Sequence, residues 1–176
     1  MRPRSGRRPQ SPPGESFFTT VSAALGRANA RACPRSILRD MRTDIVAAGI
    51  VIEHGKVLLS RRKKGSHLAG LWEFPGGKAE AGEDPRAALR RELEEELGIR
   101  TRIGEIVEVT FHRYDDADKA VLLLFFEAVR EEGSPEARAI DVAEVAWRDV
   151  KALAPETFPP ADVAVLAKVR ARLEAL

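Results

Sequence analysis

The sequence contains a single cysteine, Cys33, in 176 residues. One thiol excludes a disulfide framework and a cysteine-rich metal cluster. The chain also has no run of about 18 apolar residues, so we expect no segment that spans a membrane. The N-terminal arginines are not followed by a short apolar stretch with a small-residue cleavage site, so no secretory signal is expected. These absences together predict a cytoplasmic protein without a membrane partner.

Acidic residues are scarce in only one part of the chain. Residues 1–42 carry nine Arg and two acids, whereas residues 43–176 carry 20 basic and 25 acidic residues. The net charge of +2 is therefore the sum of a basic segment and an acidic one. The stretch "MRPRSGRRPQSPPGES" is rich in Arg, Pro and Ser, a composition typical of disorder. We interpret residues 1–42 as a disordered basic extension and residues 43–176 as one folded domain.

Three interpretations of residues 1–42 stay open. The segment can be a basic arm that contacts a polyanion. It can be an organelle transit peptide, which is rich in Arg and Ser. It can also be an extension without function that results from a start assigned too early. Met41 stands directly before the first expected strand, which favours the third interpretation.

The rest of the chain mixes strand and helix patterns. "DIVAAGIVIEH" and "KVLLSRR", joined by a short turn with Gly, predict a hairpin, and "IGEIVEVTFHRY", "AVLLLFFEAV" and "EVAWRDV" predict three further strands. "DPRAALRRELEEEL" predicts a helix with Asp84 as its cap, Pro85 in its first turn and Gly98 at its end. "ADVAVLAKVRARLEAL" predicts a closing helix. Because strands and helices do not alternate regularly, the fold class is α/β (α+β) with a mixed sheet.

Four carboxylates crowd the five residues "ELEEE", at Glu92, Glu94, Glu95 and Glu96. At about 100° per residue, Glu92, Glu95 and Glu96 converge beside the leucine stripe, and Glu94 points elsewhere. Like charges at i,i+4 destabilise a helix, and acids near its C-terminal end oppose the dipole. A cluster that breaks two local rules is a candidate site, and carboxylate oxygens suit Mg²⁺ or Mn²⁺. The alternative is an ordinary solvated helix face.

The spacing around these acids resembles the Nudix box, G-x5-E-x7-R-E-U-x-E-E-x-G-U, in which U is aliphatic. Every fixed position of the box is matched in residues 77–99, which makes the motif highly specific. The matching residues are Gly77, Glu83, Arg91, Glu92, Leu93, Glu95, Glu96, Gly98 and Ile99. The resemblance runs from about Asp44 to the end of the chain, and residues 1–42 lie outside it.

The resemblance implies an α/β/α sandwich with a mixed sheet and a catalytic loop–helix–loop. It also implies Mg²⁺-dependent hydrolysis, with Mn²⁺ as a substitute ion, of a nucleoside diphosphate linked to another group. Glu92, Glu95 and Glu96 are then expected to bind or orient the metal, with the carbonyl of Gly76 as a further ligand. In the same comparison Arg91 orients the carboxylates and Glu83 helps to place the attacking water. Which glutamate is the general base stays open.

Two stretches outside the box, "RRKKGSHLAGLWEFPGGK" and "FPPAD", resemble MutT-type and CTP-pyrophosphohydrolase-type members. Those enzymes cut nucleoside triphosphates to the monophosphate and pyrophosphate. By analogy Arg62 reaches the nucleotide, Phe74 or Phe158 lines the base pocket, and Gly77 lets the backbone approach the ligand. The alternatives are a solvated Arg62 and two phenylalanines of the ordinary core. His67 is expected at the surface.

Asp162 departs from the MutT-type pattern, which commonly has Asn at this position. An ionised Asp only accepts hydrogen bonds, whereas Asn both donates and accepts. A carboxylate can accept from guanine, from 8-oxoguanine or from the amino group of cytosine. Alternatively, Asp162 simply caps the last helix. Sanitation of 8-oxo-dGTP is therefore the leading prediction, and hydrolysis of CTP or modified dCTP is the second.

A hypothesis from a different class is a Nudix module that binds a nucleotide without cleaving it. Such modules often lack acids of the box, and here all of them are present. The excess of acids in residues 43–176 argues against a large surface for nucleic-acid phosphates, so no stable nucleic-acid binding is expected. The predicted partner is a nucleoside triphosphate, and a monomer and a homodimer both remain open.

The basic extension yields a direct prediction. A chain that starts at Met41 should keep its melting temperature and turnover, because residues 1–40 have too little apolar patterning to pack. Thermal melts and initial rates of the shortened and full chains compare the two. A large loss of either would show that this interpretation is wrong.

Overall fold

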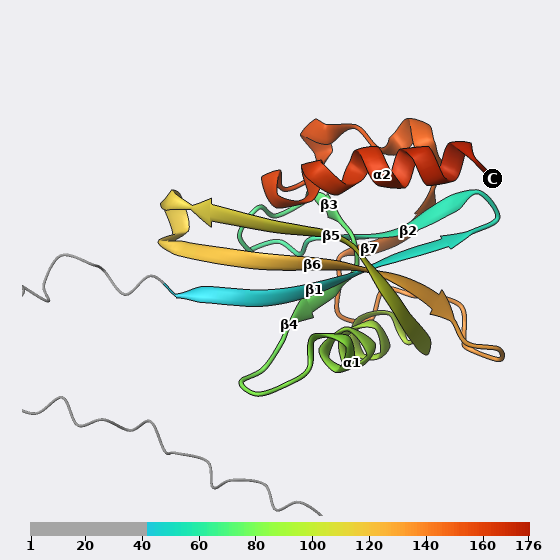
Figure 1. The fold of residues 1–176 in the computed structure, drawn as a ribbon, viewed down its shortest axis with the longest axis horizontal. Coiled ribbons are helices and arrows are strands. Elements are labelled where there is room, and N and C mark those ends of the chain that lie inside the picture. The colour runs from blue at the N-terminus through green and yellow to red at the C-terminus, as the bar shows by residue number, and fades with distance from the viewer. Residues whose placement is uncertain (1–41) are drawn as a thin grey trace, which may run out of the picture. The chain divides into compact units, whose positions relative to one another are not determined.

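The computed structural model describes residues 42–176, so the expectations for the N-terminal extension lie outside the described part, apart from its last residue. This part forms three layers, with a sheet between α1 and α2 (Figure 1). The strands are β1 (Thr43–Glu53), β2 (Lys56–Arg61), β3 (Trp72–Glu73), β4 (Gly76–Lys78), β5 (Thr101–Tyr114), β6 (Lys119–Arg130) and β7 (Glu144–Arg148). The helices are α1 (Pro85–Leu97), α2 (Val163–Glu174) and four short 3₁₀ turns, η1 (Asp115–Ala117), η2 (Val150–Ala152), η3 (Pro155–Thr157) and η4 (Pro160–Asp162).

The sheet is mixed, as the sequence predicts. Its main path runs β3-β2-β1-β6-β5, with β4 paired to β1 and β7 paired to β2. The pairing of β1 with β6 is parallel, and the other pairings are antiparallel. The parallel pair brings the start of the domain beside its sixth strand, in the middle of the sheet. The α/β/α sandwich is thereby confirmed.

Helix α1 has the ends that its sequence predicts. The Asp84 carboxylate accepts hydrogen bonds from the backbone N–H groups of Arg86 and Ala87, at 3.0 and 3.1 Å, and Pro85 opens the helix. Gly98 ends it in the left-handed region at φ 71°. The leucine stripe is fully buried, as Leu89, Leu93 and Leu97 show. This burial fixes the rotation of the helix and hence the direction of its glutamates.

Each face of the sheet has its own apolar core. Adjacent residues of a strand point to opposite faces, so Phe126 packs under α1 while Phe125 packs under α2. On the second face, Val165 and Leu166 of α2 complete the core. The two faces are therefore separate environments, and the site described below draws on both.

Neither helix of residues 42–176 is long and apolar enough to cross a bilayer.

Candidate active site

Arg91 connects the loop before α1 to the helix itself. Its guanidinium donates to both carboxylate oxygens of Glu83, at 3.1 and 3.0 Å. It also donates to Glu92 at 2.8 Å, to Glu95 at 3.2 Å and to the carbonyl of Lys78 at 3.3 Å. The bonds from Arg91 hold the pKa of Glu83 below its usual range. One cation thus orients three carboxylates of the box.

The glycines of β4 let the backbone lie directly against these acids. A Cβ atom on Gly77 would stand 2.3 Å from Cδ of Glu92, and one on Gly76 would stand 2.2 Å from the carbonyl oxygen of Ala47. Gly76 also has φ 147°, which favours glycine. Its N–H donates a hydrogen bond to the carboxyl of Glu96. The Gly-Gly pair therefore brings the turn, β1 and α1 into close contact.

Glu96 lies half-buried at the centre of a group of negative charges. Burial raises its pKa to about 8, and the charges of Glu73, Glu92 and Asp141 add to the effect. The N–H of Gly76 opposes this shift in part. Glu94, by contrast, is exposed on the other side of the helix, as expected. The acids beside the leucine stripe thus create a local excess of negative charge.

The chemistry of these donors fits a hard divalent cation. Within residues 42–176, no three acidic, His or Cys side chains are clustered closely enough to hold a metal ion as they stand. Glu92 and Glu95 are engaged by Arg91, and Glu96 is engaged by Gly76. All available donors are nevertheless oxygens, and the raised pKa of Glu96 shows crowding that a cation relieves. Glu92, Glu95, Glu96 and the Gly76 carbonyl are the groups that fit Mg²⁺ or Mn²⁺.

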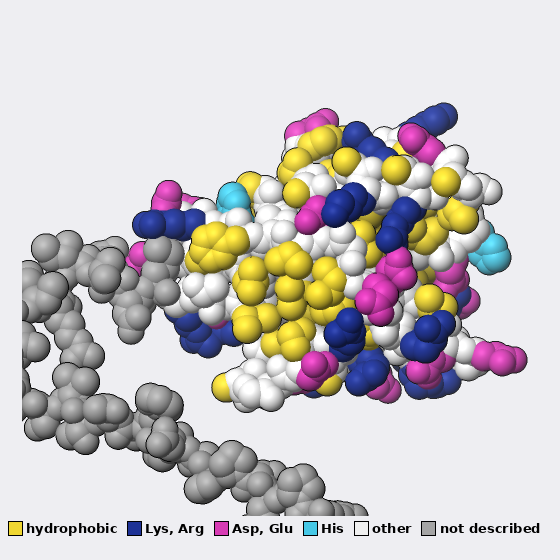
Figure 2. Space-filling model, in the orientation of Figure 1, with side chains coloured by type: hydrophobic (Ala, Val, Ile, Leu, Met, Phe, Trp, Pro, Cys, Tyr) yellow, Lys and Arg dark blue, Asp and Glu magenta, His cyan; other side chains and the backbone are white. Residues whose placement is uncertain are grey.

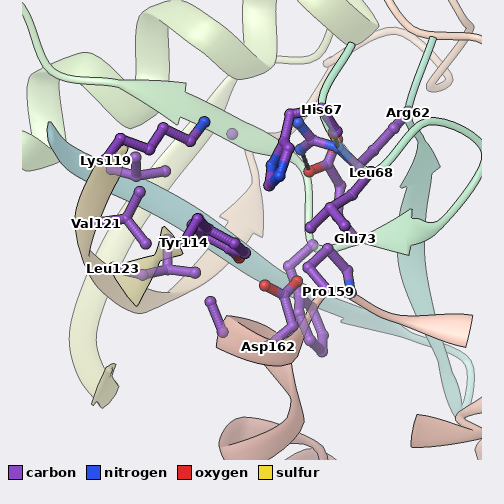
Figure 3. A pocket seen from close by; sticks show the side chains of 15 residues that line it. Arg62, His67, Leu68, Glu73, Tyr114, Lys119, Val121, Leu123, Pro159 and Asp162 are labelled. Carbon is purple, nitrogen blue, oxygen red and sulfur yellow. Dashed lines mark hydrogen bonds and ion pairs between the residues drawn. The ribbon is translucent and has the colours of Figure 1, made fainter. Parts of the chain in front are cut away.

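A cavity lies on the α2 face of the sheet, beside this acidic group (Figure 3). Asp162 is only 4% exposed, and its carboxyl points into the cavity. Tyr114 forms part of the wall, and burial followed by the charge of Asp162 raises the pKa of its hydroxyl. The further lining residues labelled in Figure 3 include Arg62, His67, Leu68, Glu73 and Lys119. The cavity therefore combines apolar walls with a few polar groups, as ligand sites do.

The Asp162 carboxyl is held as a neutral acid. Burial raises its pKa to about 8, the charge of Glu73 adds to the effect, and the Phe74 N–H and the charge of Arg62 oppose it. The raised pKa favours the protonated form at neutral pH over the ionised carboxylate that the sequence analysis assumed, and a protonated carboxyl both donates and accepts hydrogen bonds. The helix-cap alternative is wrong. Asp162 occupies the cap position of α2, but its side chain makes no capping hydrogen bond.

The remaining predicted residues divide between the cavity and the core. Arg62 is not solvated: its Nε donates to the carbonyl of His67 at 2.8 Å, and its guanidinium pairs with Glu73. Phe74 lines the cavity and is also part of the core. Phe158 lies behind Phe74, with ring centroids 5.9 Å apart, and is a core residue that does not line the cavity.

His67 lies in a different place from the one expected. Its side chain is only 23% exposed and forms part of the cavity wall. The ring stands 4.8 Å from the ring of Tyr114, centroid to centroid, and Nε2 is 3.1 Å from a carboxylate oxygen of Asp116. These contacts join the loop after β2 to the turn after β5 at the cavity.

Sequence reasoning missed several polar residues at the site. Lys63, Lys78 and Lys119 line the space between the cavity and Glu96, together with Arg62. Lys78 directly follows the Gly-Gly pair, so its position in the sequence could have indicated that it lies at the site. Lys119 and Tyr114 have no such local signal, because the β5–β6 hairpin places them there. Basic side chains therefore line this space together with the acids Asp44, Glu73 and Asp141, and Lys63 pairs with Asp141.

Comparisons with known proteins show which proteins this chain resembles. The family model for the NUDIX domain matches residues 43–169. The 8-oxo-dGTP diphosphatase of Escherichia coli is 36% identical over 126 residues, which cover 71% of this chain and 95% of that protein. The CTP pyrophosphohydrolase of the same organism is 55% identical over 62 residues, 35% of this chain and 46% of that protein.

A solved structure shows the same fold. The MutT NUDIX hydrolase from Burkholderia pseudomallei aligns with a TM-score of 0.64 and 25% sequence identity, covering 73% of this chain and 98% of that one. The matched region includes both the acidic helix and the strands that line the cavity, since the domain match spans residues 43–169. The chain belongs to the Nudix hydrolase family.

Proposed function

We propose that this Nudix hydrolase converts a nucleoside triphosphate to the monophosphate and pyrophosphate with Mg²⁺ or Mn²⁺, and that its substrate is an oxidised purine nucleotide such as 8-oxo-dGTP. The observation that carries the proposal is the position of Asp162. Its buried carboxyl lies in a cavity that shares Arg62, Glu73 and Gly76 with the space beside the acidic helix. A base in the cavity therefore has its phosphates at the catalytic glutamates.

The relatives support this substrate class. The 8-oxo-dGTP diphosphatase of Escherichia coli is similar along nearly its whole length. The CTP pyrophosphohydrolase has higher identity over a shorter stretch, which keeps CTP or modified dCTP as the second candidate. A module that binds without cleaving is not supported, because every acid of the box is present. We expect the enzyme to act in the cytoplasm, with a nucleotide as its partner and without stable nucleic-acid binding.

The reaction is the hydrolysis of the anhydride between the α and β phosphorus atoms. Water attacks one of these phosphorus atoms, the bridging P–O bond breaks, and a catalytic carboxylate takes the proton of the water. A divalent cation, when bound, neutralises phosphate charge and makes the attacking water more acidic. Glu92, Glu95 and Glu96 hold this cation, and Arg91 keeps the first two in place. Glu83, fixed by the same guanidinium, would help to place the attacking water.

Three lysines lie where they would bind the phosphates of the nucleotide. Lys63, Lys78 and Lys119 offer ammonium groups along the path from the cavity to Glu96. Lys78 already pairs with Asp44 at 2.7 Å, so its ammonium is held in place by the fold. Charge-assisted hydrogen bonds from such groups favour the negative charge of the phosphates. Positioning the anhydride at the carboxylates in this way contributes to the rate.

Asp162 reads the base with one donor and one acceptor. As a neutral acid, its O–H can donate to the C8 carbonyl of 8-oxoguanine and its C=O can accept from the N7–H, two groups that guanine lacks. The same pair also fits N3 and the amino group of cytosine, so this residue alone does not separate the two candidates. The aromatic wall, Tyr114 and Phe74, is suited to stacking on either base.

A nucleotide panel tests the proposal. We expect kcat/KM with Mg²⁺ to be highest for 8-oxo-dGTP, at least about tenfold above dGTP, with pyrophosphate as the product. The panel also includes CTP, dCTP, a modified dCTP and ADP-ribose, and pyrophosphate and phosphate release are measured separately. A preference for CTP or modified dCTP would select the second candidate. A preference for ADP-ribose, or release of phosphate in place of pyrophosphate, would contradict the proposal.

The glutamates of α1 give a second test. Glu92→Gln, Glu95→Gln and Glu96→Gln keep side-chain size but remove a carboxylate ligand, so at least two of them should lower turnover by about 10²-fold or more. Glu94→Gln is the matched control, because Glu94 is exposed on the same helix outside the cluster. Circular dichroism checks the fold. Near-normal turnover in all three variants, or full activity in excess chelator, contradicts the assignment.

The state of Asp162 predicts a pH dependence. Its folded pKa of about 8 means that the O–H donor is present below that pH and is lost as the pH rises through it. The preference for 8-oxo-dGTP over dGTP, as a ratio of kcat/KM, should therefore fall above about pH 8, by roughly 5- to 150-fold for one mismatched buried group. Asp162→Asn keeps its donors at all pH values, so its ratio should stay flat.

The design of this measurement separates Asp162 from its neighbours. Glu73, Arg62 and Tyr114 also face the cavity, but they are unchanged in Asp162→Asn and cancel in the comparison. Titration of the bases cancels as well, because both proteins receive the same two substrates. Asp162→Ala should weaken both substrates. A wild-type ratio as flat as that of the Asn variant would remove Asp162 from base recognition.

A further inference from the structure

The short turn η4 (Pro160–Asp162) carries Asp162 to the cavity and has few backbone groups that can hold it there. Pro159 and Pro160 have no backbone N–H, so neither can donate a hydrogen bond. Asp162 uses its own N–H inside the turn, where it donates to the carbonyl of Pro159 at 2.9 Å. Within η4, the N–H of Ala161 is therefore the backbone donor that can anchor the turn to another part of the protein.

The Ala161 N–H finds its partner on a distant strand. Ala161 is buried, with 1% of its surface exposed, which leaves its N–H little contact with water. Nearly all buried backbone donors in folded proteins are paired. Here the hydroxyl of Tyr114, the last residue of β5, accepts a hydrogen bond from this N–H, and η4 packs against β5. One hydroxyl thus ties the end of a strand to the turn that bears Asp162.

The ring of Tyr114 is held in place by its neighbours. His112, two residues earlier on the same face of β5, contacts it with ring centroids 4.5 Å apart. His67, in the loop after β2, makes a second ring contact at 4.8 Å and is itself held by Asp116. Both contacts are edge-to-face, an arrangement that aromatic pairs favour. These contacts limit the movement of the ring and so fix where its hydroxyl lies.

Asp162 depends on this anchor for its position. Its backbone follows Ala161 directly, and its carboxyl accepts a hydrogen bond from the N–H of Phe74. Figure 3 shows Tyr114 extending toward Asp162 within the cavity wall. A recognition group discriminates well only when neighbouring residues hold it to within about 0.5 Å. Without the Tyr114 hydroxyl, the carboxyl would rely on the bond from Phe74 and on a turn that is no longer tied to β5.

We propose that Tyr114 is a positioning residue for base recognition, an inference that rests on the function proposed above. By accepting the Ala161 N–H, its hydroxyl fixes η4 and so fixes the Asp162 carboxyl where it meets the base. The ring of Tyr114 remains part of the cavity wall, whereas the hydroxyl acts through Asp162. Phenylalanine at this position keeps the ring and its contacts and removes only the anchor.

Amide hydrogen exchange, followed by NMR on the full chain, tests the anchor without any nucleotide. The Ala161 amide should be protected in the wild type, and Tyr114→Phe should speed its exchange at least about tenfold. The amide of Val169, buried in the middle of α2, is the reference for a general loss of stability. An unprotected Ala161 amide in the wild type overturns the anchor. So does an Ala161 rate that rises in Tyr114→Phe no more than the Val169 rate.

Substrate preference tests the effect on recognition. We expect Tyr114→Phe to lower the ratio of kcat/KM for 8-oxo-dGTP over dGTP by at least about fivefold, the effect of one lost buried hydrogen bond. A residue that only stabilises the fold would slow both substrates alike. Thr110→Val is the matched control, because it removes a hydroxyl of the same strand that makes no hydrogen bond within residues 42–176. A Tyr114→Phe ratio equal to that of the wild type contradicts the proposal.

A double-mutant cycle shows whether the hydroxyl acts through Asp162. Tyr114→Phe should have no further effect on the ratio in the Asp162→Ala background, because the group that it positions is absent. A fall of equal size in both backgrounds would mean that the hydroxyl contacts the base directly, which overturns the positioning role. The exchange measurement needs no nucleotide, so failure of the anchor is distinguished from failure of the proposed function.

Discussion

The hydrogen bonds of Arg91 are the interaction on which the acidic helix depends. Three buried leucines fix the rotation of α1, and this rotation forces Glu92 and Glu96 to the same side. Mutual repulsion on such a helix would turn the carboxylates toward water. Arg91 counters it by donating to Glu83, Glu92 and Glu95 together. The same guanidinium ties the loop before the helix to the helix, so loop and helix act as one unit.

The glycine pair before the loop is the second constraint, and it is steric. The β4 backbone lies so close to Glu92 and β1 that no Cβ atom fits at Gly77 or Gly76 without displacing a neighbour. This contact brings the N–H of Gly76 to Glu96 and places Lys78 in the wall of the space beside Glu96. Charge pairing by Arg91 and close approach at the glycines therefore work together.

Glu96 and Asp162 show how surroundings give two carboxyls different tasks. Burial raises the pKa of each to about 8. Glu96 also faces Glu73, Glu92 and Asp141, a concentration of charge that a cation relieves. Asp162 is enclosed in a cavity beside aromatic rings, where the protonated acid is favoured and can both donate and accept hydrogen bonds. Glu73, paired with Arg62, stands between the two and contributes charge to both.

The sequence itself determined helix α1, with its caps and its leucine stripe, and the complete Nudix box. Each of these features depends on residues that are close together in the chain. The contact of Arg91 with Glu95 likewise follows from i,i+4 spacing. Only the tertiary structure decided the surroundings of four other residues. It raises the pKa of Asp162, places His67 on the cavity wall and brings Tyr114 and Lys119 to the same cavity. These four residues come from three segments far apart in the chain, namely the loop after β2, the β5–β6 hairpin and η4. The physical reason is that desolvation depends on everything packed around a group, whereas helix formation and capping depend on the few residues beside it.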